Sequence, residues 1–199
     1  MTRWQQFYLE DQRVLTVPPS ACAHYAVAYF QHANQKLLLD LGCGVGRDTL
    51  LLAQSGLQVI GVDAAPAGLI MAQQRNAGHP HSFILVEADA RCLPFPAATF
   101  AGVYCFGLLH EFVGETATAD VQQVMGEIAR VLQPGGSLLL AVLAGEPTQG
   151  LPQVQMFSEQ MLDEVTAGFA CIEKCLYDDV GCTGRADYKI WRGAYSKAR

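Results

Sequence analysis

The chain has 199 residues, of which 51% are hydrophobic, and a formal net charge of −6 at pH 7. This length and hydrophobic content suit a single domain, residues 1–199, built around one sizeable core. A nucleic-acid partner is not expected, because a protein that binds one needs a basic surface to neutralise the phosphates.

The first 35 residues are expected to be largely helical. Trp4–Asp11 suits a short helix. Ser20 suits the N-cap of a second helix that runs to about Ala33, because its hydroxyl can accept hydrogen bonds from the unpaired N–H groups of the first turn. The aliphatic run Leu37–Leu41 then predicts a buried strand.

Three alternating glycines, Gly42, Gly44 and Gly46, follow this strand, and helical periodicity resumes after them. Glycines at these positions let backbone N–H groups approach a ligand closely. Asp40 at the strand end would repel a pyrophosphate and attract an ammonium or sulfonium group. Arg47 stands where the dinucleotide-binding pattern requires a small residue, so the turn favours a cationic nucleoside.

Further apolar runs alternate with helical segments through the middle of the chain. This alternation predicts a doubly wound, mostly parallel sheet with helices on both faces and the ligand at the carboxyl ends of the strands. A helix is expected from about Ser158 to Ala167. The remaining strands are expected at Val59–Asp63, Phe83–Val86, Val103–Phe106, Ser137–Val142, Ala170–Tyr177 and Tyr188–Tyr195.

Five stretches, in order and at ordinary spacing, resemble the motifs of class I S-adenosylmethionine-dependent methyltransferases. One position departs from the family, because Ala101 follows Phe100 where an acid is usual. The five stretches are Asp40–Gly46 (acidic-x-Gly-x-Gly-x-Gly), Val59–Asp63, Phe83–Ala90, Val103–Phe112 and Ile128–Gly136.

The resemblance implies a Rossmann-like, seven-stranded sheet that ends in an antiparallel hairpin. It divides the chain into an N-terminal helical lid, residues 1–35, a cofactor-binding core, residues 36–143, and a lid loop, helix and closing hairpin, residues 144–199. The implied cofactor is S-adenosylmethionine, with S-adenosylhomocysteine as product.

Residues at the strand ends are the expected cofactor ligands. Asp63 would accept from the ribose hydroxyls, and Asp89 would receive the adenine amino group, with Ala90 beside the ring and Glu87 as a competitor for Asp89. The full expected set is Asp40, Gly42, Cys43, Gly44, Gly46, Asp63, Ala64, Asp89, Ala90, Phe106 and Gly107.

Catalysis by in-line methyl transfer would rest on alignment and exclusion of water. His110 is the expected general base, with an ascending pH limb near 6 to 7. The alternative is a histidine that caps the next helix. Glu111 is a second catalytic candidate, and Arg47 would either bind a carboxylate or remain a surface charge. Trp4, Tyr8, Tyr25, Trp191 and Tyr195 would form either an aromatic wall or ordinary core.

The expected acceptor is a small molecule, because no inserted domain is evident. The alternatives are a protein or RNA methyltransferase, a non-catalytic S-adenosylmethionine-binding module, and a dinucleotide oxidoreductase. A thiol or arsenite acceptor is a special case, since Cys171, Cys175 and Cys182 are close in sequence, although core packing is the plainer interpretation. The sequence leaves the oligomeric state open.

The remaining composition suggests a cytoplasmic location without membrane contact. There is no apolar run of 18 residues, and Met1–Glu10 lacks the basic start and apolar core of a signal peptide. The seven cysteines are odd in number and form no Cys-x-x-Cys pair, so reduced thiols are expected. No zinc-type spacing of histidine and cysteine is present, and no metal is expected.

Overall fold

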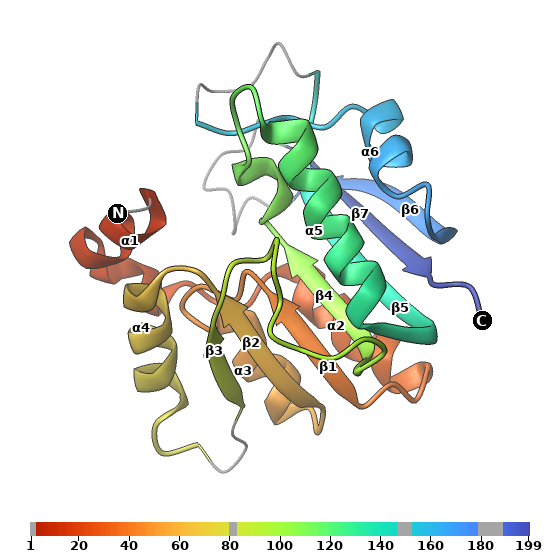
Figure 1. Cartoon of the computed structure of the whole chain (residues 1–199). Coiled ribbons are helices and arrows are strands. Elements are labelled where there is room, and N and C mark those ends of the chain that lie inside the picture. The colour runs from red at the N-terminus through yellow and green to blue at the C-terminus, as the bar shows by residue number, and fades with distance from the viewer. Residues whose placement is uncertain (1–2, 80–82, 147–152, 179–188) are drawn as a thin grey trace.

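The computed structural model describes residues 3–79, 83–146, 153–178 and 189–199. Figure 1 shows a central twisted sheet with helices on both faces. The helices are α1 (Arg3–Glu10), α2 (Ala21–His32), α3 (Arg47–Gln54), α4 (Pro66–Asn76), α5 (Ala117–Val131) and α6 (Glu159–Val165), with 3-10 turns η1 (Gln12–Thr16) and η2 (Leu109–Glu111). The strands are β1 (Leu37–Leu41), β2 (Gln58–Asp63), β3 (Ile84–Glu87), β4 (Phe100–Phe106), β5 (Leu132–Ala144), β6 (Ala170–Asp178) and β7 (Lys189–Ser196).

The strand order is β3-β2-β1-β4-β5-β7-β6, with β7 antiparallel to both of its neighbours and the other pairs parallel. This confirms the predicted mixed sheet and its antiparallel hairpin. The order reverses between β1 and β4, where Asp40 is in register with Gly61 on one side and Tyr104 on the other. A crevice at the carboxyl ends of the strands is expected at such a reversal.

Strand β1 is buried on both faces, which explains its nearly continuous aliphatic run. Successive strand residues point to opposite faces. Leu39 packs in the cluster that includes Val124 and Ile128 of α5, whereas Leu38 packs in the cluster that includes Phe30 of α2. The helices therefore cover the sheet as two layers.

Two local predictions can be compared with the structure. Ser20 caps α2, and its hydroxyl accepts from the N–H of Ala23 at 3.0 Å. The strand predicted at Ser137–Val142 is longer in the structure, because β5 begins at Leu132. Phe100 of β4 pairs with Leu132 of β5, and Gly102 of β4 pairs with Ser137 of β5. The register therefore shifts between these two pairs, and the Pro-Gly turn is an irregularity within β5.

Three predicted features fall wholly or partly outside the described residues. They are the lid loop, of which residues 147–152 are not described, Tyr188 of the final extended segment, and Cys182. Within the described ranges, none of the helices has the length and apolar character needed to cross a membrane.

The close approach of α2 to the sheet generates a stability prediction. A Cβ at Gly102 would stand 2.5 Å from a ring carbon of Phe30 and 2.7 Å from a methyl carbon of Leu38. Gly102→Ala should therefore destabilise the protein by about 1–3 kcal/mol in urea unfolding.

Gly126 in α5 is the matched control, because a Cβ there would meet nothing within 4 Å. Gly126→Ala should stabilise the helix by roughly 0.5–1 kcal/mol. Equal effects of the two substitutions would contradict the close packing of α2 against β4.

Candidate functional site

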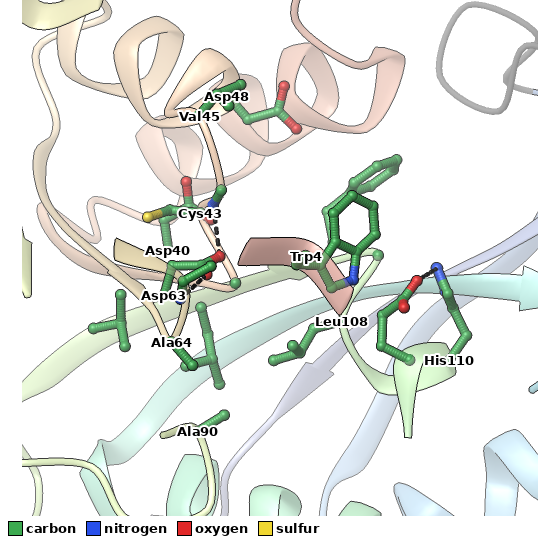
Figure 2. A pocket seen from close by; sticks show the side chains of 18 of the residues that line it. Trp4, Asp40, Cys43, Val45, Asp48, Asp63, Ala64, Ala90, Leu108 and His110 are labelled. Carbon is green, nitrogen blue, oxygen red and sulfur yellow. Dashed lines mark hydrogen bonds and ion pairs between the residues drawn. The ribbon is translucent and has the colours of Figure 1, made fainter. Parts of the chain in front are cut away.

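A cavity of about 890 Å³ lies at the carboxyl ends of the parallel strands. It is bounded by the end of β1 and the glycine turn, the end of β2, the segment Ala88–Arg91, the end of β4 with η2, and α1. Figure 2 shows Asp40, Asp63 and Ala64 on one side of the cavity, with His110 on the other and Trp4 between them. The site is thus assembled at the predicted edge of the sheet.

The glycine turn requires its glycines for conformation and for space. Gly42, Gly44 and Gly46 have φ values of +81°, +51° and +70°, which L side chains rarely adopt. A Cβ at Gly44 would stand 2.5 Å from the hydroxyl oxygen of Tyr8 in α1. The N–H groups of Gly42 and Cys43 donate to the carbonyl of Val62 at 2.8 and 3.0 Å, which ties the turn to β2.

Asp63 lies against the same turn. Its Oδ2 accepts from the N–H of Gly44 at 2.8 Å, and its Oδ1 accepts from the N–H of Ala65 at 2.8 Å. Burial raises the pKa of this carboxyl, and the backbone donors oppose the increase. The carboxylate is therefore fixed at the edge of the turn, and each oxygen has a further lone pair for a ligand hydroxyl.

Asp40 is the most deeply placed acid of the turn, with 3% of its surface exposed. Burial raises its pKa to about 7, and the nearby charges of Asp48 and Asp63 act in the same direction. The hydroxyl of Thr49 donates to Asp40 Oδ2 at 2.6 Å and partly offsets this effect. A positively charged ligand in the cavity would favour the ionised form of Asp40.

Asp48 is a cavity residue whose role the sequence did not indicate. It accepts from the N–H of Ser20 at 2.8 Å, from the Ser20 hydroxyl at 2.7 Å and from the hydroxyl of Tyr104 at 2.9 Å. These bonds join the start of α2 to α3 and β4. An acid in the first turn of a helix is readily explained by the helix dipole, so the sequence carried no signal for this network.

Arg47 immediately precedes Asp48, and its guanidinium carbon lies 5.5 Å from the centroid of the Phe106 ring. Its Nη1 also donates to the carbonyl of Pro18 at 3.3 Å. Arg47, Phe106 and Gly107 all line the cavity. Arg47 is therefore directed toward the site rather than toward open solvent.

Asp89 and Ala90 also line the cavity, whereas Glu87 is exposed and is not among the described lining residues. Asp89 pairs with Arg91 at 2.6 Å, and this hydrogen bond lowers the pKa of Asp89. Arg91 in turn pairs with Asp120 at 2.8 Å. Asp89 is thus the better placed of the two acids to receive an adenine amino group. A ligand there would share the Asp89 carboxylate with Arg91.

His110 and Glu111 lie at the far end of the cavity, with 12% and 13% of their side-chain surfaces exposed. His110 Nδ1 accepts from the N–H of Leu143 at 3.3 Å, and Nε2 lies 3.4 Å from Glu111 Oε1. Burial, assisted by the charge of Arg3, lowers the pKa of His110 to about 4. An ascending limb near pH 6 to 7 is therefore not expected from this histidine.

Helix α1 lies along the mouth of the cavity. Arg3 forms an ion pair with Glu111 and donates to the carbonyl of Gln153 at 2.8 Å. At the other end of α1, the ring of Tyr8 lies against both Gly44 and Gly68. Helix α1 therefore connects η2, the segment at Gln153, the glycine turn and α4.

Of the five aromatic residues considered for a wall, Trp4 and Tyr8 line the cavity. Tyr195 belongs to the core with 1% exposure, and Trp191 packs against that core. Tyr25 is covered by the guanidinium of Arg192, whose central carbon lies 3.6 Å from the ring centroid.

Cys171 and Cys175 are not among the described residues that line the cavity. Cys171 is exposed and Cys175 is half-buried, both on β6, so the expectation of core packing is wrong for these two. Their strand is at the outer edge of the sheet, where only one neighbour covers it. Within the described ranges, no group of three or more metal-binding side chains is present.

Comparison with known proteins shows a family match. A family model described as a methyltransferase domain matches residues 39–140. A demethylmenaquinone methyltransferase from Thermus thermophilus is 36% identical over 108 residues, which cover 53% of this chain and 46% of that protein. A 2-phytyl-1,4-naphtoquinone methyltransferase from Thermosynechococcus vestitus is 34% identical over 136 residues, 66% of this chain and 57% of the relative. The chain thus spans about half the length of these relatives.

A solved structure extends the similarity of fold to nearly the whole chain. The Burkholderia thailandensis 1,6-didemethyltoxoflavin-N1-methyltransferase, solved with 1,6-didemethyltoxoflavin and S-adenosylhomocysteine bound, has a TM-score of 0.72 at 21% identity. The match covers 98% of this chain and 85% of that one. At 21% identity this similarity establishes the fold alone.

The buried position of Asp40 predicts a pH-dependent stability difference. A carboxyl whose pKa is raised to about 7 in the folded state stabilises the fold below its unfolded pKa, and that contribution is lost as the pH rises to about 7. Asp40→Asn cannot ionise. Its stability relative to the native chain should therefore increase from pH 4 to pH 7 and then level off.

Urea unfolding across this pH range measures the difference. Asp178→Asn, on the exposed edge of β6, is the control and should show no comparable rise. A pH-independent difference for Asp40→Asn would show that Asp40 is already ionised at pH 4.

Proposed function

The chain belongs to the methyltransferase domain family, and on that premise we propose that it is an S-adenosylmethionine-dependent methyltransferase with a small-molecule acceptor. The observation that carries the proposal is the glycine turn flanked by the buried Asp40 and the half-buried Asp63 in one cavity. A cationic nucleoside suits this site, because positive charge relieves the desolvation and repulsion that raise the pKa of Asp40.

The residues around the turn fit the parts of this cofactor. Asp63 would accept from the ribose hydroxyls, and the turn would bring backbone N–H groups close to the ligand. Asp89 and Ala90 would contact the adenine, while Phe106 and Gly107 border the passage to the acceptor. The bound cofactor supplies an activated methyl group on its sulfonium.

Apolar side chains on the outer side of the cavity support a small acceptor. Trp4 and Phe7 come from α1, and Phe112, Leu143 and Val154 come from the opposite rim. We propose that residues 1–35 act as a lid, since α1 lies along the mouth and is joined to the far rim through Arg3. Enclosure by this lid favours a molecule small enough to be covered.

The protein's part in the reaction is to bind and to orient. The acceptor attacks the methyl carbon in line with the departing sulfur, so the rate depends on alignment of the two molecules and on exclusion of water. Positive charge decreases at sulfur during this step. The deep acids therefore serve mainly to hold the cofactor, and a proton acceptor is needed only where the nucleophile carries a proton.

Cofactor binding provides the direct test. Asp63→Ala should weaken S-adenosylmethionine binding by about 1.5–3 kcal/mol, because a charge-assisted acceptor for two hydroxyls is lost. Isothermal titration calorimetry measures the change.

Glu87→Ala is the matched control, since Glu87 ends the adjacent strand but is exposed and is not among the described lining residues. It should bind the cofactor normally. Binding of NAD with no heat for S-adenosylmethionine would contradict the proposed function.

A further inference from the structure

A hydrogen bond from the backbone to the His110 ring indicates which tautomer the ring adopts. Nδ1 faces the N–H of Leu143 at 3.3 Å and must therefore present its lone pair there. In the neutral imidazole the proton then resides on Nε2, which faces the Glu111 carboxylate at 3.4 Å. The atom directed toward Glu111 is thus a donor, and the one lone pair of the ring is used by the backbone.

The burial of His110 also favours the neutral form of its ring. The pKa of His110 falls to about 4, so the ring is neutral at physiological pH. A neutral ring with an occupied lone pair can hold a neighbouring carboxylate in place but is poorly arranged to remove a proton from an acceptor. The structure thus favours a positioning role for His110.

Two side chains from different segments lie beside the Glu111 carboxylate. Arg3 of α1 pairs with Oε2, and His110 faces Oε1. Each carboxylate oxygen has two lone pairs, so one on each oxygen remains for a further donor. An acceptor hydroxyl that donates to one of these lone pairs is placed for transfer of its proton to Glu111.

The surroundings of this carboxylate are apolar and aromatic. Trp4 and Phe7 pack edge to face with ring centroids 5.1 Å apart, and Phe112 follows Glu111 on the opposite rim. The charges of Arg3 and Glu111 compensate each other, and His110 adds none. This end of the cavity therefore offers a weakly polar space in which Glu111 is a hydrogen-bond acceptor, and such a space suits a neutral planar molecule better than an anion.

We propose that this end of the cavity binds a neutral aromatic acceptor that carries a hydroxyl, and that Glu111, positioned by His110 and Arg3, is the catalytic residue that takes the hydroxyl proton. This inference rests on the proposed methyltransferase function. As the S–CH₃ bond breaks, the O–CH₃ bond forms and S-adenosylhomocysteine leaves. The proton passes from the hydroxyl to Glu111 and then from Glu111 to water.

Two probes of the same shape test the acceptor class. Protein saturated with S-adenosylhomocysteine is titrated by calorimetry with 1-naphthol and with 1-naphthoate, which differ in charge. 1-Naphthol should bind at least about tenfold more tightly, because the carboxylate would have to be desolvated beside Glu111. Equal or tighter binding of 1-naphthoate, or no binding of 1-naphthol, would overturn the inference.

Turnover with 1-naphthol then separates the roles of the two residues. Glu111→Gln should lower kcat by about 100-fold or more, within the range for loss of a general base, and leave the affinity for S-adenosylhomocysteine unchanged. His110→Gln retains an N–H donor toward Glu111 and should lose less than about fivefold, whereas His110→Ala should lose more. Glu115→Gln, exposed on the loop after η2, is the control.

The outcomes separate failure of the proposed role of Glu111 from failure of the proposed methyltransferase function. A loss in His110→Gln as large as that in Glu111→Gln would assign the proton to the histidine and overturn the inference. The same holds if 1-naphthol is not methylated or if Glu111→Gln turns over normally. Failure of S-adenosylhomocysteine to bind at all would instead reject the proposed function, and the inference with it.

Discussion

Removal of carboxylates from water in one cavity is the constraint around which the site is organised. Asp40, Asp48 and Asp63 line the cavity around one glycine turn, and burial raises the pKa of Asp40 to about 7. Each acid is held by donors from the protein, including Thr49 for Asp40 and two backbone N–H groups for Asp63. These donors limit the cost of burial without removing it. A bound cation would complete the compensation, so the ligand should stabilise the fold.

The parallel pairing of the strands is sufficient to bring these acids together. Parallel pairing sets Asp40 beside Gly61 of β2 and Tyr104 of β4, at the point where the strand order reverses. Tyr104 in turn donates to Asp48, whose other donor is Ser20 at the start of α2. The same network that supports the acids therefore fixes the point at which the N-terminal segment enters the site.

Local sequence signals were sufficient for the fold and for the inner half of the site. The glycines, Asp40 and Asp63 lie within or next to strands whose apolar pattern is plain, so their convergence at one edge follows from parallel topology. The outer half depends on contacts between distant segments. Arg3 meets Glu111 across 108 residues, and Leu143 meets His110 across 33. Neither contact has a periodic signature, so the sequence gives no sign that the His110 ring is buried and that its Nδ1 accepts from the Leu143 N–H.

The central claim is that the buried acids are matched to a positively charged ligand, and proton release on binding tests it most directly. At pH 7, Asp40 with a pKa of about 7 is about half protonated. Calorimetric titration with S-adenosylmethionine in buffers of different ionisation enthalpy should therefore show release of up to about half a proton per site, and Asp40→Asn should abolish that release. Binding without proton release, or release that is unchanged in Asp40→Asn, would contradict the account.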